Sequence, residues 1–289
     1  MAVCDRRGCE PRDMKVLCLA VMALCLFAVA PLMATHYEVI VLTGQSNSLG
    51  TTGGGEEDSS PGSDSADDQV KFFWHNRVDA ERALGDSGGD FSSLQAQQGG
   101  MYAGDATHWG PEMGFGRAWV QSGGPPLAII KSSRGGGGNG LWSKEAEGHM
   151  YRQVVETVRA ATEALVQNGD TFEIVGLLYL QGESDSPEEA AMAGQRLETL
   201  ANNLRDDLPE AGKMVVVCGG IAADGEARDL VRKKQAEAAA SNDTMVYFDN
   251  RDLKGHLYDQ LHFDKAAKLM VGERFARAYG DLVSESHAD

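Results

Sequence analysis

The sequence is short of positive charge. It has 26 lysine and arginine residues against 43 aspartate and glutamate residues, which gives a formal net charge of −17 at pH 7. A protein that binds nucleic acid needs a concentrated positive surface to neutralise phosphates. The sequence contains no basic run that would supply one, so we expect no nucleic-acid partner.

Cysteine is also scarce over most of the chain. Four of the five cysteines fall within residues 1–34, and only Cys218 follows them. Cys218 ends an apolar, strand-like run, which predicts a small buried core residue. With one cysteine left, residues 35–289 have no internal disulfide framework, and the packing of a core must stabilise them.

No apolar run reaches the length of a membrane span, which needs about 20 residues. The run Val16–Ala30 has basic residues before it, and Pro31–Ala34 after it ends in a small residue. This pattern is typical of a secretory signal peptide. We expect residues 1–34 to be removed, whether translation starts at Met1 or Met14, and the mature protein to be secreted or periplasmic, without stable membrane association. The alternative is a segment that is kept as an anchor.

Residues 35–289 alternate between apolar runs and helical patterns. The runs are nearly continuous, as in parallel strands buried on both faces. They lie at 38–42, 70–74, 127–130, 174–180, 214–218 and 245–248. Helical spacing lies between them, at 149–167, 187–208, 224–240 and 264–279. The alternation predicts one α/β domain, a three-layer α/β/α sandwich with a mostly parallel central sheet and ligands at the carboxyl ends of its strands.

Two glycine-rich segments interrupt this pattern. Residues 53–68 carry six negative charges and no positive one, which predicts a solvated surface loop. Their spacing does not match a helix-loop-helix calcium loop. Gly135–Gly138 lacks the Lys-Ser/Thr ending of a phosphate-binding loop. The sequence therefore implies no metal and no organic cofactor.

A candidate nucleophile follows the first strand. Ser46 lies in Gly44-Gln45-Ser46-Asn47, where a glycine allows a sharp turn and the next helical turn aims backbone N–H groups at a reacting oxygen. An N-cap serine is the alternative for this motif alone.

A candidate base lies near the C-terminus. Asp259 and His262 are three residues apart, a spacing that lets the carboxylate orient the imidazole while its other nitrogen faces a serine. His256 is a competing histidine, but no carboxylate precedes it at that spacing.

Two further turns offer oxyanion donors. Gly110, in Trp109-Gly110-Pro111-Glu112, can present a backbone N–H without side-chain obstruction. Gln181, in Gln181-Gly182-Glu183-Ser184-Asp185, follows a strand and can aim its side-chain amide at a developing negative charge.

These four motifs, in this order, resemble the sialate O-acetylesterase and acetylxylan esterase group of the SGNH hydrolase superfamily. The resemblance runs from about Thr35 to the last helix and implies a flavodoxin-like sheet. It implies Ser46 as nucleophile, His262 as base and Asp259 as its orienting carboxylate, with an oxyanion hole formed by Ser46, Gly110 and Gln181. The superfamily usually has Asn at the position of Gln181 and Gly-Asp-Ser-Leu around the serine; both departures are typical of this branch.

Other residues near these motifs have two interpretations each. Asn47 belongs to the nucleophile motif and is expected to support it or to contact substrate. Glu183 is expected to hold its turn rather than act as an acid, and Glu112 to cap its own helix. Trp109 suits either sugar stacking or core packing. Arg134 follows the third strand and either reaches the cleft or points to solvent.

The sequence thus predicts a secreted serine esterase that removes O-acetyl groups from carbohydrates, either an acetylxylan-like polysaccharide or an O-acetylated sialic acid. The negative net charge favours neutral glycans, although a local cleft potential can oppose it. The oligomeric state is left open.

Three alternatives remain at this point. One is a carbohydrate-binding protein without catalysis. Another is an esterase for lipids or aryl esters, which a greasy lid would support, whereas the inserts are acidic or glycine-rich. The third is a metal-dependent hydrolase, although its candidate ligands lack a recognised spacing. Those ligands are Asp249, Asp252, His256, Asp259 and His262.

Overall fold

The computed structural model describes residues 34–50, 61–100, 106–145 and 149–286. Its contacts divide the chain into two units, Met1–Ala34 and Thr35–Asp289, and the fold is that of the second unit. The expected signal peptide lies outside the described residues. None of the helices in the described ranges is long and apolar enough to cross a membrane.

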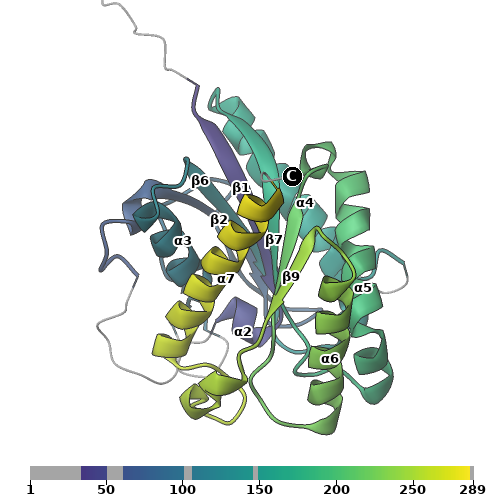
Figure 1. Ribbon diagram of the computed structural model, residues 1–289. Coiled ribbons are helices and arrows are strands. Elements are labelled where there is room, and N and C mark those ends of the chain that lie inside the picture. Colours follow the sequence, from purple (N-terminus) through teal and green to yellow (C-terminus); the bar gives the residue numbers. More distant parts are fainter. Residues whose placement is uncertain (1–33, 51–60, 101–105, 146–148, 287–289) are drawn as a thin grey trace, which may run out of the picture. The chain divides into compact units, whose positions relative to one another are not determined.

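A seven-stranded sheet forms the centre of the fold, with the strand order β3-β2-β6-β1-β7-β8-β9 (Figure 1). Every pair in it is parallel except β2 with β3. The strands are β1 (His36–Gly44), β2 (Val70–Arg77), β3 (Ala83–Asp86), β6 (Leu127–Ser133), β7 (Thr171–Leu180), β8 (Val215–Gly219) and β9 (Met245–Phe248). Without β2 and β3, the order is the 2-1-3-4-5 of flavodoxin-like sheets. The strand order changes direction at β1, so the carboxyl end of β1 is the expected place for a ligand.

Helices cover both faces of the sheet. The main ones are α3 (Glu112–Gln121), α4 (His149–Gln167), α5 (Pro187–Asp207), α6 (Glu226–Ala240) and α7 (Lys265–Ser286). Apolar residues of α3 and α7 share one buried cluster with the sheet, whereas those of α4 and α5 share another. In Figure 1, α7 crosses in front of the sheet and α4 lies behind it. The predicted three-layer sandwich is therefore confirmed.

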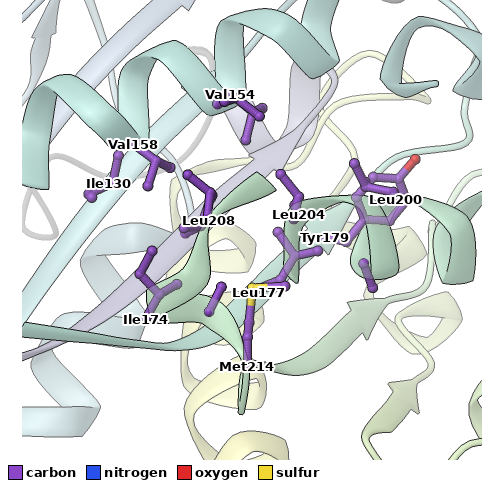
Figure 2. Close-up of a cluster of buried hydrophobic side chains, with 14 of the residues drawn as sticks. Ile130, Val154, Val158, Ile174, Leu177, Tyr179, Leu200, Leu204, Leu208 and Met214 are labelled. Carbon is purple, nitrogen blue, oxygen red and sulfur yellow. The ribbon is translucent and has the colours of Figure 1, made fainter. Parts of the chain in front are cut away.

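The cluster under α4 and α5 shows how the sequence pattern becomes packing. Val154 and Val158 project from one face of α4, and Leu200 and Leu204 from one face of α5, because residues three or four apart share a helix face. Figure 2 shows these side chains in one cluster with Leu177 and other strand residues. Each fully buried side chain of this kind stabilises the fold by about 1.5–3 kcal/mol.

The six predicted strands and four predicted helices are all present. Their ends differ by at most three residues, except that the last helix continues seven residues further, to Ser286. Local signals explain the accurate ends. α5 begins with a capping box in which Ser186 accepts from the Glu189 N–H and Glu189 accepts from the Ser186 N–H, with Pro187 in the first turn. The sequence does not predict the edge strand β3 or the short pair β4 (Gln97–Gln98) and β5 (Thr107–His108), because strands of two to four residues carry little periodicity.

The acidic segment 53–68 is described from residue 61 onward. There the expectation of a solvated loop is wrong at Asp67, which is buried and accepts two hydrogen bonds of 2.8 Å from Arg117 of α3. The Gly62 N–H donates to the same carboxylate at 2.7 Å. The carboxylate therefore anchors the end of this segment to the domain.

Candidate active site

The nucleophile turn joins β1 to the single-turn helix α2 (Ser46–Leu49). Gly44 has a φ of 148°, and a Cβ there would lie 2.0 Å from the Leu180 carbonyl oxygen at the end of β7. Only glycine allows this close approach of the two strand ends. The turn thereby brings Ser46, 2 % exposed, to the carboxyl edge of the sheet.

The histidine comes from a closed loop before α7. Residues 257–263 are held by a bridge between Leu257 and Phe263 and by the Tyr258 N–H, which donates to the His262 carbonyl at 3.0 Å. Within the loop, Gln260 has a φ of 69°, an uncommon value for a residue with a side chain. This bend returns the chain so that Asp259 and His262 face one another.

Ser46, His262 and Asp259 form a continuous hydrogen-bonded relay. Ser46 Oγ lies 2.9 Å from His262 Nε2, and His262 Nδ1 lies 2.6 Å from Asp259 Oδ2. The other oxygen of Asp259 accepts from the His262 N–H at 2.7 Å. His256 instead contacts Asp264 at 3.0 Å. The histidine beside the serine is therefore His262, in the geometry of a serine, a base and an orienting carboxylate.

The surroundings of Asp259 keep its carboxylate charged. Burial alone would raise the pKa of Asp259, but the hydrogen bonds from the His262 side chain and from the His262 and Leu261 N–H groups outweigh it and lower the pKa below its usual value. An ionised Asp259 fixes the proton of His262 on Nδ1 and leaves Nε2 as the acceptor that faces Ser46.

Asn47 connects the nucleophile turn to both neighbouring loops. Its Nδ2 donates to Glu183 Oε1 at 2.6 Å and to the Leu261 carbonyl at 3.1 Å, while its Oδ1 accepts from the Phe263 N–H at 3.0 Å. These bonds bracket His262 on both sides in the sequence. Asn47 therefore sets the position of the histidine loop relative to Ser46.

Glu183 is buried with only one of its oxygens in a hydrogen bond. Its Oε2 has no hydrogen-bond partner among the described residues. Burial raises the pKa of Glu183 above its usual value, against the opposing effects of the Asn47 hydrogen bond and of the nearby His262. The residue does hold its turn to the nucleophile, as predicted, and it also places a carboxyl group within electrostatic range of the base.

The structure does not agree with the prediction of a free N–H at Gly110. The Gly110 N–H donates to Glu112 Oε1 at 2.8 Å, so it already has an acceptor inside the protein. Glu112 is thus bound to the turn before its helix and to Lys131, whose Nζ lies 2.9 Å from both of its carboxylate oxygens. Lys131 Nζ also donates to the Leu49 carbonyl at 2.7 Å. This buried pair ties the Gly110 turn to the end of α2.

Gln181 lies at the end of β7, as predicted, with its side chain buried. Its Nε2 donates to Asp185 Oδ1 at 2.6 Å and lies 3.5 Å from the Gly137 carbonyl oxygen, a distance at which a hydrogen bond is weak. Its Oε1 accepts from the Tyr179 hydroxyl at 3.1 Å. One amide N–H is therefore firmly engaged and the other only loosely.

Two of the candidate substrate contacts are packed side chains. Trp109 is 3 % exposed, with Lys268 Nζ 3.8 Å from the centre of its ring, so the ring is not a surface for sugar stacking. Arg134 does not point to solvent. It is buried, donates to the Gly135 carbonyl at 3.0 Å and lies 2.7 Å from His149 Nε2.

The residues of the metal alternative are dispersed over separate pairs. Asp249 pairs with Arg251, Asp252 with Arg274, His256 with Asp264, and Asp259 with His262. Across the described ranges, no three histidine, cysteine or acidic residues are grouped as a metal site would require.

Some supporting residues were not recognised in the sequence. Gln45 accepts from the Gly182 N–H at 3.0 Å and donates to the Ser184 hydroxyl at 3.0 Å, which joins the nucleophile turn to the Gln181–Asp185 turn. Tyr258 stacks beside His262, with the ring centres 6.1 Å apart. Gln45 lies inside the nucleophile motif and Tyr258 directly precedes Asp259, and these positions are the signal that could have identified them.

Comparisons with known proteins agree with this geometry. The family model described as carbohydrate esterase, sialic acid-specific acetylesterase matches residues 36–281. A search of the curated proteins gave no match.

Solved structures show the same fold. A protein from Arabidopsis thaliana is 22 % identical, with a TM-score of 0.62 over 84 % of this chain and 98 % of that one. NanS is 17 % identical, with a TM-score of 0.56 over 88 % and 100 %. A carbohydrate acetylesterase from Xanthomonas citri is 17 % identical, with a TM-score of 0.52 over 84 % and 56 %.

These identities are low, so the three structures support the fold alone, whereas the family model spans nearly all of the second unit. The resemblance noted in the sequence is thereby confirmed. The chain belongs to the carbohydrate esterase family of sialic acid-specific acetylesterases, a family of carbohydrate O-acetylesterases.

Proposed function

We propose that this protein is an exported serine esterase that removes acetyl groups from sugar hydroxyls through an acetyl-enzyme intermediate. The observation that carries the proposal is the relay from Ser46 through His262 to Asp259, with contacts of 2.9 Å and 2.6 Å. A protein that only binds carbohydrate has no need of this relay, which activates a hydroxyl as a nucleophile.

In the first half of the reaction, Ser46 Oγ attacks the carbonyl carbon of the acetyl ester while His262 Nε2 takes the hydroxyl proton. Asp259 stabilises the imidazolium that forms. When the tetrahedral intermediate collapses, the bond to the sugar oxygen breaks and His262 gives its proton to that oxygen. The sugar leaves with a free hydroxyl, and the acetyl group stays on Ser46.

In the second half, His262 takes a proton from water, and the oxygen of that water attacks the acetyl carbon. The second tetrahedral intermediate releases acetate, and the proton returns from His262 to Ser46 Oγ. The cycle uses side chains of this chain and one water molecule.

The negative charge of both intermediates needs N–H donors at the end of β1. The Ser46 N–H is the first helical amide of α2 and has no acceptor among the described residues. The loosely engaged N–H of Gln181 is the second donor in our proposal. Gly110 has no part in it, because its N–H is bound to Glu112. One such donor typically contributes about 10²–10³-fold in kcat.

Export is the second part of the proposal. It rests on the charged start, the apolar run Val16–Ala30 and the small residues that follow. Polymeric or cell-surface glycans suit an enzyme in that location. Sequencing of the N-terminus of protein recovered from outside the cytoplasm tests it, with a start near Thr35 expected for a cleaved signal peptide.

Labelling with an organophosphonate tests the catalytic proposal. We expect the label on the peptide that contains Ser46, and at least about 100-fold slower labelling in a His262→Gln variant, because the serine then lacks its base. His256→Gln is the matched control, since His256 contacts Asp264 rather than the serine. Label on another residue, or equal rates in both histidine variants, would reject the relay as the source of activity.

A further inference from the structure

The position of His262 decides on which side of the site the sugar of the substrate lies. In the proposed reaction, His262 Nε2 gives its proton to the sugar oxygen when the ester bond breaks, so that oxygen comes within hydrogen-bond reach of Nε2, about 2.6–3.2 Å. The acetyl carbon is bonded to Ser46 Oγ at that moment. The sugar ring therefore lies next to the imidazole, and the side chains around His262 are those that can contact it.

Tyr258 is an aromatic side chain that stands beside this imidazole and reaches the surface. The centres of the two rings are 6.1 Å apart, and their planes are inclined by 28°. Tyr258 is 38 % exposed, whereas Trp109 is buried. Over the described ranges, the other exposed large apolar side chains are Val166 and Met192, which lie on α4 and α5. Tyr258 is thus the one aromatic residue among them, and it lies beside the reacting groups.

The histidine loop holds Tyr258 in place before any ligand binds. The Tyr258 N–H donates to the His262 carbonyl at 3.0 Å, and the bridge between Leu257 and Phe263 begins one residue earlier. On the other side, Asp259 is fixed by its bonds to the side chain and the N–H of His262. A tyrosine has only two side-chain torsion angles to fix, so a ring on this backbone offers a large contact area at a small entropy cost.

A sugar in its pyranose form is chemically complementary to such a ring. The C–H groups on one side of a pyranose carry partial positive charge, and the face of an aromatic ring is negative, so the two faces attract one another. Tyrosine also combines an apolar ring with a polar edge. It therefore suits a ligand that is apolar on one face and bears hydroxyl groups around its rim.

The charges near the loop do not favour one kind of sugar. A cleft of about 570 Å³ that borders the loop is lined by two carboxylates, Asp224 and Asp259, and by two cations, Arg228 and Lys254. Because these charges balance, electrostatic attraction in the cleft selects neither neutral nor acidic sugars. Contact with the ring of Tyr258 is open to both, since it depends on the C–H face that pyranoses share.

We propose that Tyr258 binds the sugar of the substrate by stacking its ring on a pyranose ring, on the leaving-group side of the site. The proposal rests on the carbohydrate esterase activity proposed above. It makes Tyr258 the residue that distinguishes a sugar ester from the ester of a simple alcohol. Ser46 and His262 act on the acetyl group, which both kinds of ester share, whereas Tyr258 acts on the alcohol, in which they differ.

Kinetics on esters with and without a sugar test this assignment. The substrates are an O-acetylated methyl xyloside, an O-acetylated sialic acid and ethyl acetate, and the measured quantity is the ratio of kcat/KM for each sugar ester to kcat/KM for ethyl acetate. We expect Tyr258→Leu to lose roughly 3- to 10-fold of this ratio for at least one sugar, mainly through KM, because an aromatic contact of this kind is lost. Tyr258→Phe should keep the ratio, because the ring remains.

A role of Tyr258 in holding His262 alone predicts a different result. All three substrates form the same acetyl-enzyme on Ser46, and a displaced base slows the formation and the hydrolysis of that intermediate with each of them. The rates of Tyr258→Leu would then fall together, and the ratio would stay at the wild-type value. That result, or an equal loss in Tyr258→Phe and Tyr258→Leu, would overturn the proposal.

Tyr37→Leu is the matched control. Tyr37 lies near the amino end of β1, whereas Ser46 follows the carboxyl end of the same strand. The same substitution there should leave the ratio at the wild-type value. A loss in Tyr37→Leu as large as that in Tyr258→Leu would show that the ratio responds to general damage and would remove the support for Tyr258.

A binding measurement separates this proposal from the proposed catalysis. Saturation-transfer NMR on the Ser46→Ala variant with methyl xyloside and with sialic acid, both without O-acetyl groups, involves no turnover. We expect transfer from the protein to the ring C–H protons of at least one sugar, and its loss in Ser46→Ala/Tyr258→Leu. That result supports the stacking contact even if Ser46 is not the nucleophile. Equal transfer in the two variants, or none in either, rejects the contact even though the esterase is active.

Discussion

Glu112 and Glu183 are both buried beside the nucleophile turn, but only Glu112 has a cation next to its carboxylate. Glu112 has a buried cation, Lys131, against both of its oxygens. Glu183 has one bond from the neutral Asn47, and its second oxygen has no hydrogen-bond partner in the described ranges. Glu112 holds the Gly110 turn and Glu183 holds the turn after β7, yet only Glu112 is paired with a cation.

The presence or absence of a paired cation gives Glu112 a structural role and Glu183 an electrostatic one. A buried ion pair with several hydrogen bonds is costly to break and holds its elements in a fixed register. A buried carboxylate without a cation costs stability, and its remaining attraction is available to a positive charge that appears during the reaction. The imidazolium of His262 is that charge in the proposed mechanism.

The largest effect is expected for Lys131→Met. The change leaves Glu112 as a buried charge without its cation, which should lower the free energy of unfolding by about 3–5 kcal/mol. Urea denaturation measures it. Lys144→Met is the control, because the side chains of the Lys144–Asp207 pair are 43 % and 27 % exposed and pairs near the surface contribute at most about 1 kcal/mol. Equal losses in the two variants would show that the buried pair does not fix the fold.

A smaller effect is expected for Asn47→Ala. It removes the bonds to Glu183 and to both sides of His262, and leaves the Phe263 N–H without its acceptor. We expect a loss of about 1–3 kcal/mol in the free energy of unfolding, together with a lower kcat because the base is no longer held against Ser46.

Ser48→Ala provides the comparison for Asn47. Its hydroxyl lies in the same turn and contacts Ser133 Oγ at 2.8 Å, away from the histidine loop. Melting and steady-state kinetics on both variants should show a drop in kcat for Asn47→Ala alone. A similar drop in both would mean that general damage to the turn, and not the position of His262, lowers the rate.

Glu183→Gln is expected to change stability least. Unlike the two substitutions above, it should raise the free energy of unfolding. Because burial raises the folded-state pKa of Glu183, folding the ionised form is penalised at pH values above it. The amide removes that penalty, so the variant should be more stable than the wild type at neutral pH. The advantage should shrink as the pH falls and vanish below the usual carboxyl value of about 4.5, where both the folded and the unfolded wild type are protonated.

The same variant should be a poorer enzyme. Without the Glu183 carboxylate, the imidazolium of His262 keeps Asp259 but loses part of its electrostatic stabilisation. We therefore expect kcat to fall by about tenfold, which is about 1.4 kcal/mol in the barrier. Thermal melts from pH 4 to pH 8 and kcat at neutral pH test both statements. A variant less stable than the wild type at neutral pH, with unchanged kcat, would remove the proposed distinction between Glu112 and Glu183.

The sequence was sufficient where local patterns decide the structure. Continuous apolar runs located the six main strands, because a strand buried on both faces excludes polar residues. The spacing of Asp259 and His262 indicated their contact, because three residues in one tight loop leave few arrangements. Ser46 could be placed because the motif follows a strand end directly.

The sequence was insufficient where a partner lies far along the chain. Lys131 and Glu112 contact one another only when β6 and α3 are packed together. Trp109 is buried in the cluster that α3 and α7 form with the sheet, where Lys268 of the last helix lies over its ring. Arg228 belongs to no motif in the sequence, and the main-chain carbonyls of Glu183 and Asp224 hold its guanidinium. Contacts of this kind depend on tertiary packing, which no local spacing encodes.

The most direct test of the central claim is acetate release from an O-acetylated sugar by the wild type and by Ser46→Ala. The account predicts that the wild type releases acetate and that the variant loses at least about 10⁴-fold in kcat, while a melt shows the same folded domain. Acetate release by Ser46→Ala at a rate near that of the wild type would contradict Ser46 as the nucleophile, and with it the acetyl-enzyme mechanism.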